Sequence, residues 1–542
     1  MTVWNRWFGR GPERSSRPPT PSDILQQKTD AKVSGRLDKD VRFLQDLFGR
    51  NDDFVIRTLQ MFDSRPACLL YFSNLVNRDV INEHILKPLM GAERPRRGLR
   101  DARGMKQFLA KRVIYYGEVH YEHRLAKVAE ALLRGETILL VEGLDEALHL
   151  ATRNVVERAV EQPETEQVIR GGRDGFTELL ATNVTLLRYR LQTPNFRVQM
   201  LTIGRATKTK VGVCYVEGVA NDTLVQEVLD RLQAVDVDGV IDAGTLEQFI
   251  EDNHWSPFPQ IQNTERPDKC VATLLEGRVV ILTDGTPFAL IVPAVFTQFY
   301  QTLDDYTERP LMASLIRMVR IVALIFSLVF PSLYVSVIAF NPELIPTKFA
   351  VAVAGGRAGV PFPAVVEVLV MEVTMEVLRE ATLRLPQQVG GALSIVGVLV
   401  VGQAAVAAGF ASPITVVVVA LTTIGSFATP AYNAAVALRI LRFVLTVLAG
   451  IWGLYGVMLG LIAITHHMLS LRSFGVPYLS PIVPGDWQGL KDSWLRAPLW
   501  WMPRRPRHLF PQDPTRLAPD TQGVILQRPS HPLDPVRPRR RR

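Results

Sequence analysis

Four glutamates in an otherwise apolar stretch are the residues with the clearest potential for chemistry. The stretch is VVEVLVMEVTMEVLREATLRLP, residues 365–386. The last three glutamates are four residues apart, so a helix would place them on one face and Val, Leu and Met on the others. Because ionisable groups at membrane depth are costly and tend to face water-filled cavities, we interpret this face as a candidate cation path. Its members are Glu367, Glu372, Glu376 and Glu380.

Two other interpretations of this helix stay open. It could lie at the membrane surface with its acidic face in water, as amphipathic helices do. The carboxylates could instead form salt bridges with Arg379 and Arg384 of the same segment.

A second charged stretch, EQPETEQVIRGGRDGFTELL at residues 161–180, has a glycine pair between two arginines and precedes a predicted helix. It lacks the GxxxxGK[ST] spacing of a P-loop, and no lysine is placed to reach a phosphate. Glycine allows backbone conformations that other residues resist, and the stretch lies near the join of two predicted subdomains. We therefore interpret it as an interlobe hinge or a subunit contact. The residues assigned to it are Glu164, Glu166, Arg170, Gly171, Gly172, Arg173 and Gly175.

The sequence offers no convincing catalytic centre. HExxH and GxSxG motifs are absent. His466 and His467 are adjacent and cannot share a helix face to bind one metal, and His120 and His123 have no third ligand nearby. The three cysteines are scattered, which predicts buried, reduced side chains. We expect a protein that is not an enzyme and has no cofactor.

The composition indicates that part of the chain lies in lipid. Hydrophobic residues make up 47% of the 542 residues, and the mean hydropathy of +0.12 is high for a soluble protein. A membrane-spanning helix needs about 20 mostly apolar residues. Region 313–470 therefore predicts a helical transmembrane domain of about four to five spans. The candidate spans are 321–340, 390–410, 443–465 and the shorter 414–429.

The orientation of these spans follows from the charged ends of the chain. Four spans return the chain to its starting side. The first residues have no signal-peptide core and the C-terminus is rich in arginine, so the positive-inside rule places both in the cytoplasm. Arg439 and Arg442 fall on the opposite side in this arrangement, which is a mild violation of the rule.

The soluble region contains an internal repeat. LLRGETILLVEGLDEALHL (132–150) and LLEGRVVILTDGTPFALIV (274–292) align at an offset of 142 residues. Each is a β-hairpin candidate whose turn contains a glycine, Gly143 or Gly285. The soluble region is therefore expected to be an α/β domain of two similar subdomains, residues 37–160 and 161–312.

A weaker echo pairs residues 68–86 with 212–229. It predicts in each subdomain a buried strand, a polar cap and an amphipathic helix, with Asp222 or Thr223 as the second cap. In the second subdomain, the order of strand and helix through VDGVIDAG (237–244) predicts a parallel sheet with helical crossovers.

The two ends of the chain have a different composition from the rest. Residues 1–36 and 511–542 are rich in Pro and Arg and are predicted to be a disordered leader and a disordered tail. Residues 471–510 are predicted to be a cytosolic segment. The net charge of +8 comes from the basic tail, which could bind nucleic acid or an anionic membrane. The hydrophobic spans before it favour the membrane, so we expect no nucleic-acid partner.

Several longer runs resemble the A subunits of GerA-type spore germinant receptors. EQPETEQVIRGGRDGFTELLATNVTLLRYRLQTPNFRVQ resembles the family's hallmark segment, although Gly172 stands where the family commonly has proline. The runs SPFPQIQNTERPDKCVATLLEGRVVILTDGTPFALIVP, GVPFPAVVEVLVMEVTMEVLREATLRLP and LRSFGVPYLSPIVP resemble further family segments in the same order. The similar runs extend from residue 160 to residue 507.

The resemblance implies a multi-pass protein of the spore inner membrane. Such A subunits act in the lipid bilayer with a B subunit similar to amino-acid transporters and a C subunit that is a lipoprotein. The complex senses nutrients and triggers germination, in which cations leave the spore core. The nutrient pocket is usually placed on the B subunit, and the membrane domain of the A subunit is thought to form a homo-oligomeric, ion-conducting ring.

Two functional alternatives stay open. One is a paralogous accessory subunit associated with the dipicolinic-acid channel, since that branch shares the architecture and the glutamate helix. The other is a non-conducting scaffold that clusters receptor subunits through its soluble lobes.

Overall fold

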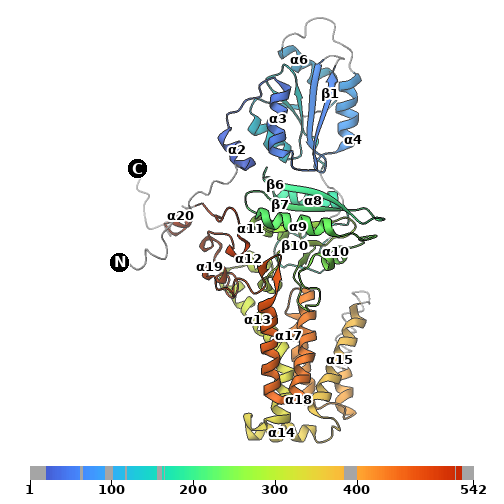
Figure 1. Cartoon of the computed structure of the whole chain (residues 1–542), viewed down its shortest axis with the longest axis vertical. Helices are drawn as coiled ribbons and strands as arrows, with labels where there is room; N and C mark the ends of the chain where they lie inside the picture. The colour runs from blue at the N-terminus through green and yellow to red at the C-terminus, as the bar shows by residue number, and fades with distance from the viewer. Residues whose placement is uncertain are drawn as a thin grey trace, which may run out of the picture.

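The computed structural model describes residues 20–61, 65–91, 102–115, 117, 119–154, 162–163, 165–383, 400–518 and 521–527. Along its longest axis, two α/β lobes are stacked above a helical bundle (Figure 1). Lobe 1 is the upper α/β unit, and lobe 2 lies between lobe 1 and the bundle.

Lobe 1 is built on a five-stranded sheet covered by helices on both faces. One face packs on α3 (Leu37–Phe48) and α7 (Leu125–Leu133), and the other packs on a helical run that begins at Arg78. The strand order is β1 (Phe54–Met61), β2 (Arg65–Phe72), β4 (Thr137–Val141), β5 (Ala147–Leu150) and β3 (Val119–Glu122).

Lobe 2 repeats this arrangement. One face of its sheet packs on α8 (Leu180–Arg190) and α11 (Pro267–Glu276), and the other packs on α9 (Asp222–Ala234) and α10 (Ala243–Ile250). The strand order is β6 (Phe196–Ile203), β7 (Thr209–Val216), β9 (Val279–Thr283), β10 (Ala289–Val292) and β8 (Gln262–Thr264). The two sheets therefore have the same connectivity, which is what the internal repeat predicts.

The repeated hairpins are present, with longer turns than a two-residue connection. β4 pairs with β5 and β9 pairs with β10, and each turn contains a glycine with positive φ, +82° at Gly143 and +91° at Gly285. Asn77 and Asn221, which correspond in the second echo, are the residues that cap the following helices. The predicted cap at Asp222 or Thr223 is wrong by one or two positions, because the Asn221 side chain accepts a hydrogen bond from the backbone N–H of Thr223 at 2.9 Å.

The predicted parallel sheet in the second subdomain is also wrong. Every strand pair of lobe 2 is antiparallel. Residues 237–242 form no strand and instead lead into α10, whose first turn Asp242 caps. The alternation of Val and Ile with polar residues in this loop resembles a strand pattern, but Val240 is buried in the core between the sheet and helices α9 and α10 and belongs to no strand.

Among the described residues, two helices are long and apolar enough to cross a membrane, and both belong to the bundle. They are α13 (Pro310–Phe340) and α18 (Tyr432–Ser470), and the apolar α17 (Pro413–Phe427) is shorter. Predicted span 321–340 lies in α13, and 414–429 largely coincides with α17. Only residues 400–410 of the span predicted at 390–410 lie within the described part of the chain. Further helices of the bundle are α14 (Thr347–Arg357) and α15 (Ala364–Leu383), and residues 400–407 are also helical.

The prediction of one continuous span over 443–465 is wrong, because α18 reverses direction at Gly453. This glycine has φ +60° and ψ −141°, far from helical values. Beyond it, Gly456 faces the carbonyl oxygen of Leu448 and Gly460 faces the side chain of Leu445. In a straight helix, residues 15 positions apart would be about 22 Å apart. α18 is therefore a helical hairpin whose two ends both lie near lobe 2.

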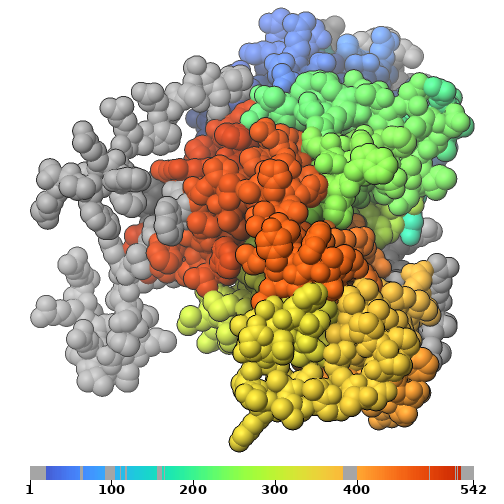
Figure 2. Space-filling model, turned by 60° about the horizontal axis from the view of Figure 1, so that its bottom comes forward, coloured from blue at the N-terminus to red at the C-terminus, as the bar shows by residue number. Residues whose placement is uncertain are grey.

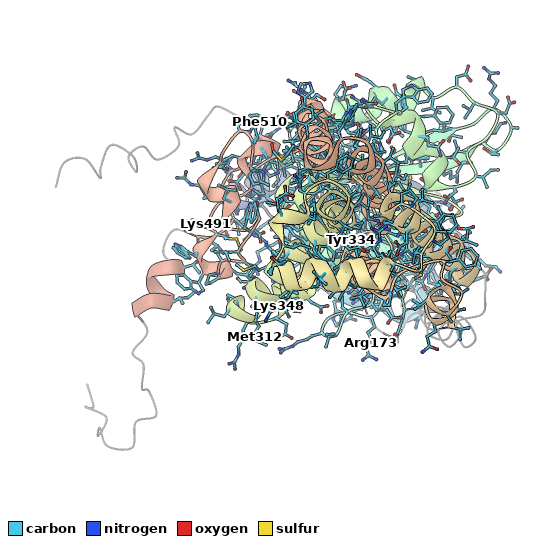
Figure 3. The ribbon with its side chains drawn as sticks, turned by 90° about the horizontal axis from the view of Figure 1, so that it is seen from below. Arg173, Met312, Tyr334, Lys348, Lys491 and Phe510 are labelled. Carbon is cyan, nitrogen blue, oxygen red and sulfur yellow. The ribbon has the colours of Figure 1, made fainter. Side chains whose placement is uncertain are left out.

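The packing of the bundle has an inner polar side and an outer apolar side. Tyr334 of α13 lies among the helices when the bundle is seen from below, and its hydroxyl is 3.0 Å from that of Thr415 (Figure 3). Large apolar side chains of the same helices are exposed in the single chain, as a lipid-facing or subunit-facing surface requires. On α15 they are Val366, Val370, Val373 and Val377.

The C-terminal segment folds back on lobe 2 after α18. Figure 2 shows its red residues packed beside the green surface of lobe 2. The Gln512 backbone N–H donates to the carbonyl of Val219 at 3.0 Å, and Arg505 donates to the carbonyl of Leu275 at 2.7 Å. Residues 511–518 therefore belong to the folded part, which shortens the predicted disordered tail.

The predicted disordered leader is also shorter than 1–36. Helix α2 (Pro21–Gln27) begins with a capping box between Thr20 and Asp23. The Val33 backbone N–H donates to the carbonyl of His123 at 2.7 Å, which fixes the leader to lobe 1. Local capping and one sheet-like contact offset the cost of ordering this segment.

Candidate functional site

The predicted carboxylate face of α15 is turned partly into the bundle. Glu367 and Glu372 are buried, with 1% and 0% of their surface exposed. The Glu376 side chain is 28% exposed, and Glu380 is exposed. The four residues do lie along one helix, as their spacing predicts. A helix on the membrane surface would have its carboxylates in water. Glu367 and Glu372 are buried, so they do not fit that interpretation.

Glu372 faces an arginine from another helix. The Nε atom of Arg442, on α18, lies 3.0 Å from Oε1 of Glu372, and both side chains are almost inaccessible to solvent. Neither oxygen of Glu372 accepts a hydrogen bond from any described residue. The two side chains are therefore held together by charge rather than by an aligned hydrogen bond, and the carboxylate keeps its acceptor capacity.

Glu376, one turn further along α15, is surrounded by arginines. Its Oε1 lies 2.7 Å from Arg379 of the same helix, 3.3 Å from Arg439 and 3.8 Å from Arg442. Arg379 is one of the two partners that the salt-bridge interpretation names, and the other, Arg384, lies outside the described residues. The arm of α18 before Gly453 thus brings two basic side chains against the acidic helix at this level of the bundle.

Glu367 is anchored at the start of α15. Its Oε2 lies 3.2 Å from Nε of Arg357, and its Oε1 accepts a hydrogen bond from the backbone N–H of Ser412. This carboxylate ties α14, α15 and the segment before α17 together. Its contacts suit a structural anchor.

Sequence reasoning missed the basic side of this layer. Arg439 and Arg442 were expected beyond the membrane helices, yet both are buried in α18, with 8% and 2% exposed. Two arginines three residues apart in an apolar stretch, opposite glutamates four apart, are a signal of complementary helix faces. We refer to Glu372, Glu376, Arg379, Arg439 and Arg442 as the charged layer.

The segment predicted as a hinge is bound to the base of lobe 2. Glu166 pairs with Lys269 at 2.6 Å, and Arg266 donates to the carbonyl oxygens of Glu166 at 3.1 Å and Gly172 at 2.8 Å. The backbone N–H groups of residues 169 and 170 donate to Asp304, which begins the helix before α13. Glu164 lies outside the described residues.

The remaining members of this segment have different environments. Gly175 is buried, whereas Gly171 and Gly172 are exposed. The side chains of Arg170 and Arg173 are also exposed, and Arg173 points away from the bundle in the view from below (Figure 3). A pocket of about 410 Å³ lies between this segment, β8 and the first residues of α18. The segment therefore lies next to the end of the bundle that faces lobe 2.

The contact between the two lobes is made elsewhere. Arg188 of α8 donates two hydrogen bonds to Asp53 of lobe 1, from Nε at 2.7 Å and from Nη2 at 2.6 Å, and both side chains are 2% exposed. Nη2 also donates to Asn51, whose side chain accepts from the backbone of Val198 as well. A bidentate, buried pair of this kind fixes one lobe on the other. The sequence gives only unspecific signals for it, since Asp and Arg are common in loops and on helix surfaces.

A third buried pair joins lobe 2 to the first bundle helix. Arg317 on α13 is fully buried, and it contacts Asp305 at 3.0 Å and Asp492 of the C-terminal segment at 3.0 Å. The Tyr306 hydroxyl donates to Asp492 at 2.7 Å. Burial raises the pKa of Asp492, while the positive charge of Arg317 opposes that rise. This junction holds the C-terminal segment, lobe 2 and α13 together.

The site contains no arrangement typical of a metal or cofactor centre within the described ranges. No group of three or more His, Cys, Asp or Glu side chains is placed to hold a metal ion there. The three cysteines are free and buried, as predicted. What this arrangement can do is position charge inside an apolar bundle and connect the bundle to two soluble lobes.

These features define a class of membrane-associated protein, in which a two-lobed α/β domain is carried on an apolar helical bundle with a buried charged layer. The chain belongs to the Bacillus/Clostridium GerA spore germination protein family, whose sequence profile matches residues 42–508.

Curated relatives are similar along most of their length. Spore germination protein KA of Bacillus subtilis is 40% identical over 90% of this chain and 89% of its own length. Spore germination protein B1 of Bacillus subtilis is 38% identical over 90% of this chain and 99% of its own length. The crystal structure of the N-terminal domain of the A subunit of the Bacillus megaterium spore germinant receptor GerK3 is 30% identical, covers 49% of this chain and 98% of that chain, and has a TM-score of 0.38.

Proposed function

We propose that this chain is the A-type subunit of a nutrient-sensing germinant receptor in the spore inner membrane. In this role it couples recognition of the germinant by the complex to ion release and germination. The family and its relatives among spore germination proteins support the proposal, as do the two candidate membrane spans. Its partners are a transporter-like B subunit, a lipoprotein C subunit and further copies of this chain in the bilayer.

The geometry of the bundle supports a multi-pass arrangement with both soluble parts on one side. α13 leaves lobe 2 at Pro310, and the α18 hairpin returns to it at Ser470. Near that end, the Ser473 hydroxyl donates to the carbonyl of Gln260 at 2.7 Å. An even number of crossings would leave the lobes and the C-terminal segment on the same side of the membrane, and we propose that this side is the cytoplasm.

The observation that carries the conducting role is the state of Glu372. It is a buried carboxylate between two apolar helices, with unused acceptor capacity and one facing arginine. A carboxylate in such a place suits transient cation binding once the arginine moves away. The pairing represents the closed state, and nutrient binding on a partner subunit shifts the population toward the open state.

The main competitor is a non-conducting scaffold, and one observation favours it. Three arginines already surround Glu376, and such an arrangement is typical of a structural salt-bridge network. In that case the charged layer fixes the bundle for assembly and carries no ion.

Reconstitution separates the two roles. The complex with its partner subunits is placed in potassium-loaded liposomes and exposed to a mixture of amino acids, sugars and nucleosides. The conducting role predicts potassium efflux that Glu372→Gln with Glu376→Gln reduces at least tenfold, whereas Glu343→Gln, an exposed glutamate after α13, leaves efflux unchanged. A silent wild-type complex would support the scaffold, and undiminished efflux in the double variant would reject the carboxylate path.

We also propose that the charged, glycine-containing segment serves as an interlobe hinge or a subunit contact, and its residues are Glu164, Glu166, Arg170, Gly171, Gly172, Arg173 and Gly175. Arg170 supports this role, because its side chain is exposed next to the backbone that binds Asp304. Arg170→Glu is expected to disrupt co-purification with the partner subunits or germination of spores. Normal assembly together with normal germination in this variant would contradict the assignment.

A further inference from the structure

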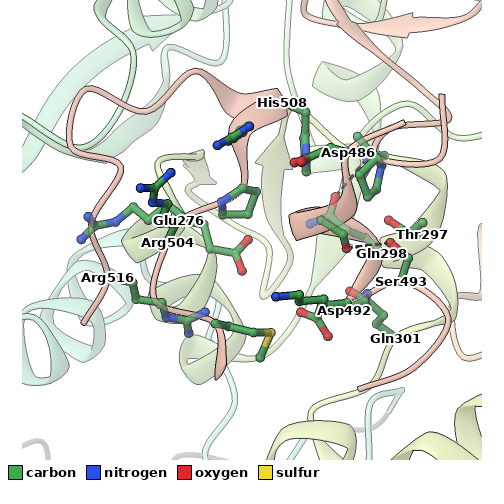
Figure 4. Close-up of a pocket in the computed structure, with 18 of the residues that line it drawn as sticks. Glu276, Thr297, Gln298, Gln301, Asp486, Asp492, Ser493, Arg504, His508 and Arg516 are labelled. Carbon is green, nitrogen blue, oxygen red and sulfur yellow. Dashed lines mark hydrogen bonds between the residues drawn. The ribbon is translucent and has the colours of Figure 1, made fainter. Parts of the chain in front are cut away.

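A cavity of about 660 Å³ lies between lobe 2 and the C-terminal segment, outside the charged layer and the hinge segment (Figure 4). Residues near 276–306 form one wall, and residues 481–493 and 501–516 form the others. Small-molecule sites in proteins measure about 300–1,000 Å³, so the cavity has the size of a binding site.

The lining of this cavity has an excess of positive charge. Six Arg and Lys side chains contribute to it, against three carboxylates. The cations are Arg278, Lys491, Arg504, Arg505, Arg507 and Arg516, and the carboxylates are Glu276, Asp486 and Asp492.

Several of these charges form close ion pairs with neighbours, but three arginines do not, although one of them, Arg516, is attracted at longer range by Glu276 and Asp492. Arg505 pairs with Asp513 at 2.9 Å, and Arg278 lies 3.4 Å from Glu276. The three are Arg504, Arg507 and Arg516. Within the described part of the chain, none of them forms an ion pair with a carboxylate. Arg504 and Arg516 lie along the same side of the cavity in Figure 4.

His508 adds uncharged hydrogen-bonding groups to the same cavity. Its two ring nitrogens are buried, and neither has a hydrogen-bond partner among the described residues. Burial, together with the nearby charge of Arg278, lowers the pKa of His508 to about 3. The ring is therefore neutral near pH 7 and offers one donor and one acceptor. Trp501 supplies a flat aromatic surface, with the Lys491 ammonium 5.0 Å from its ring centre.

We propose that this cavity binds a small organic anion with at least two acidic groups, either carboxylates or phosphates. Guanidinium groups recognise both through paired hydrogen bonds, and separated arginines on one wall can each hold one acidic group. The neutral imidazole of His508 and the Trp501 ring contact the body of the ligand. This site goes beyond the proposed germination function and does not depend on it.

Occupancy of the site has a structural consequence. Asp492 lines the cavity and also contacts Arg317 of α13 and the Tyr306 hydroxyl. A ligand that bridges lobe 2 and the C-terminal segment stabilises this junction, because it adds contacts that exist only when the segment is docked.

Binding is tested on the full chain in detergent with citrate and inorganic pyrophosphate as probes. Ionic strength is matched with sodium chloride, and titration calorimetry and the thermal unfolding midpoint are the readouts. Wild type is expected to bind at least one probe saturably, with a rise in the midpoint. Arg504→Gln with Arg516→Gln, both exposed positions, is expected to weaken that binding at least tenfold.

Two further variants make the result decisive. Arg42→Gln changes an exposed arginine of lobe 1 and is expected to bind as wild type does. Arg507→Gln removes a single arginine of the cavity and is expected to weaken binding about threefold, so it serves if the double variant misfolds. Absence of saturable binding of both probes to wild type, or equal affinity in all variants, would overturn the proposal.

Discussion

The Nε atom of Arg442 lies 3.0 Å from Oε1 of Glu372, and the two side chains are 2% and 0% exposed. The residues come from α18 and α15, which are separated along the chain by α17 and the segment before it. A buried pair of opposite charges without an aligned hydrogen bond is a weak source of stability, but removing one partner leaves a charge uncompensated. This asymmetry makes the pair suitable for a switch between two bundle conformations.

Removal of the positive partner is therefore expected to destabilise the bundle. Arg442→Gln leaves Glu372 buried without its counter-charge and should lower the free energy of unfolding by about 3–5 kcal/mol. Adding Glu372→Gln should restore part of the loss. Chemical unfolding of the purified chain in detergent measures both, with Lys348→Gln on the exposed surface of α14 as the control. Equal stability of all variants would show that the two side chains do not interact.

The interlobe pair of Arg188 and Asp53 predicts the behaviour of the soluble lobes. Arg188→Gln leaves Asp53 buried without its counter-charge, at a cost of about 3–5 kcal/mol. Lobe 1 should then become sensitive to limited proteolysis near its junction with lobe 2. Arg42→Gln, on the surface of α3, should show the wild-type cleavage pattern. An unchanged pattern in Arg188→Gln would mean that other contacts hold the lobes together.

The reversal of α18 gives a prediction about glycine. Gly453 has φ +60°, and an added Cβ would stand 2.9 Å from the ring of Phe340. Gly453→Ala should thus strain the hairpin turn and lower the yield of monodisperse protein in size-exclusion chromatography. Gly355→Ala, in helix α14 with no atom within 4 Å of the added Cβ, should behave like wild type or better. A harmless Gly453→Ala would argue for a straight α18.

The pH dependence of lobe 2 follows from Glu247 on α10. Burial, with the negative charges of Glu251 and Asp242, raises the pKa of Glu247 from 4.5 to about 7. The folded state binds this proton more tightly than the unfolded state, so its contribution to stability is full below about pH 4.5 and is lost as pH rises through about 7. Glu247→Gln should match wild type at about pH 4 and exceed it at about pH 8, by at most about 3 kcal/mol. Thermal unfolding at the two pH values checks this, and a difference that is the same at both would contradict it.

Local signals in the sequence predicted much of the soluble domain. The hairpins around Gly143 and Gly285 carry a periodic apolar pattern and a glycine that adopts positive φ, and both properties act over a few residues. The weaker echo predicted equivalent helix starts in the two lobes, although the capping residues are Asn77 and Asn221 and not the predicted Asp222 or Thr223. The similarity of the two sheets then follows from two echoes at nearly one offset.

The charged layer and the α18 hairpin could not be predicted in this way. Apolar residues on both sides of Gly453 produce one continuous hydropathy maximum, so composition does not reveal the reversal. Arg439 and Arg442 lie in the arm of α18 before Gly453, and they reach α15 only because segments distant in the sequence pack together. The interlobe contact of Arg188 with Asp53 likewise depends on tertiary structure between residues 135 positions apart.

The most direct test of the account is potassium efflux through the reconstituted complex in the absence of nutrients. If Arg442 holds the carboxylates of α15 in a closed state, Arg442→Gln should raise basal efflux well above that of wild type. Adding Glu372→Gln and Glu376→Gln to the same chain should abolish the increase, because the cation-binding groups are then lost. Basal efflux that stays at the wild-type level in properly assembled Arg442→Gln complexes, or that persists after both glutamates are neutralised, would contradict the account.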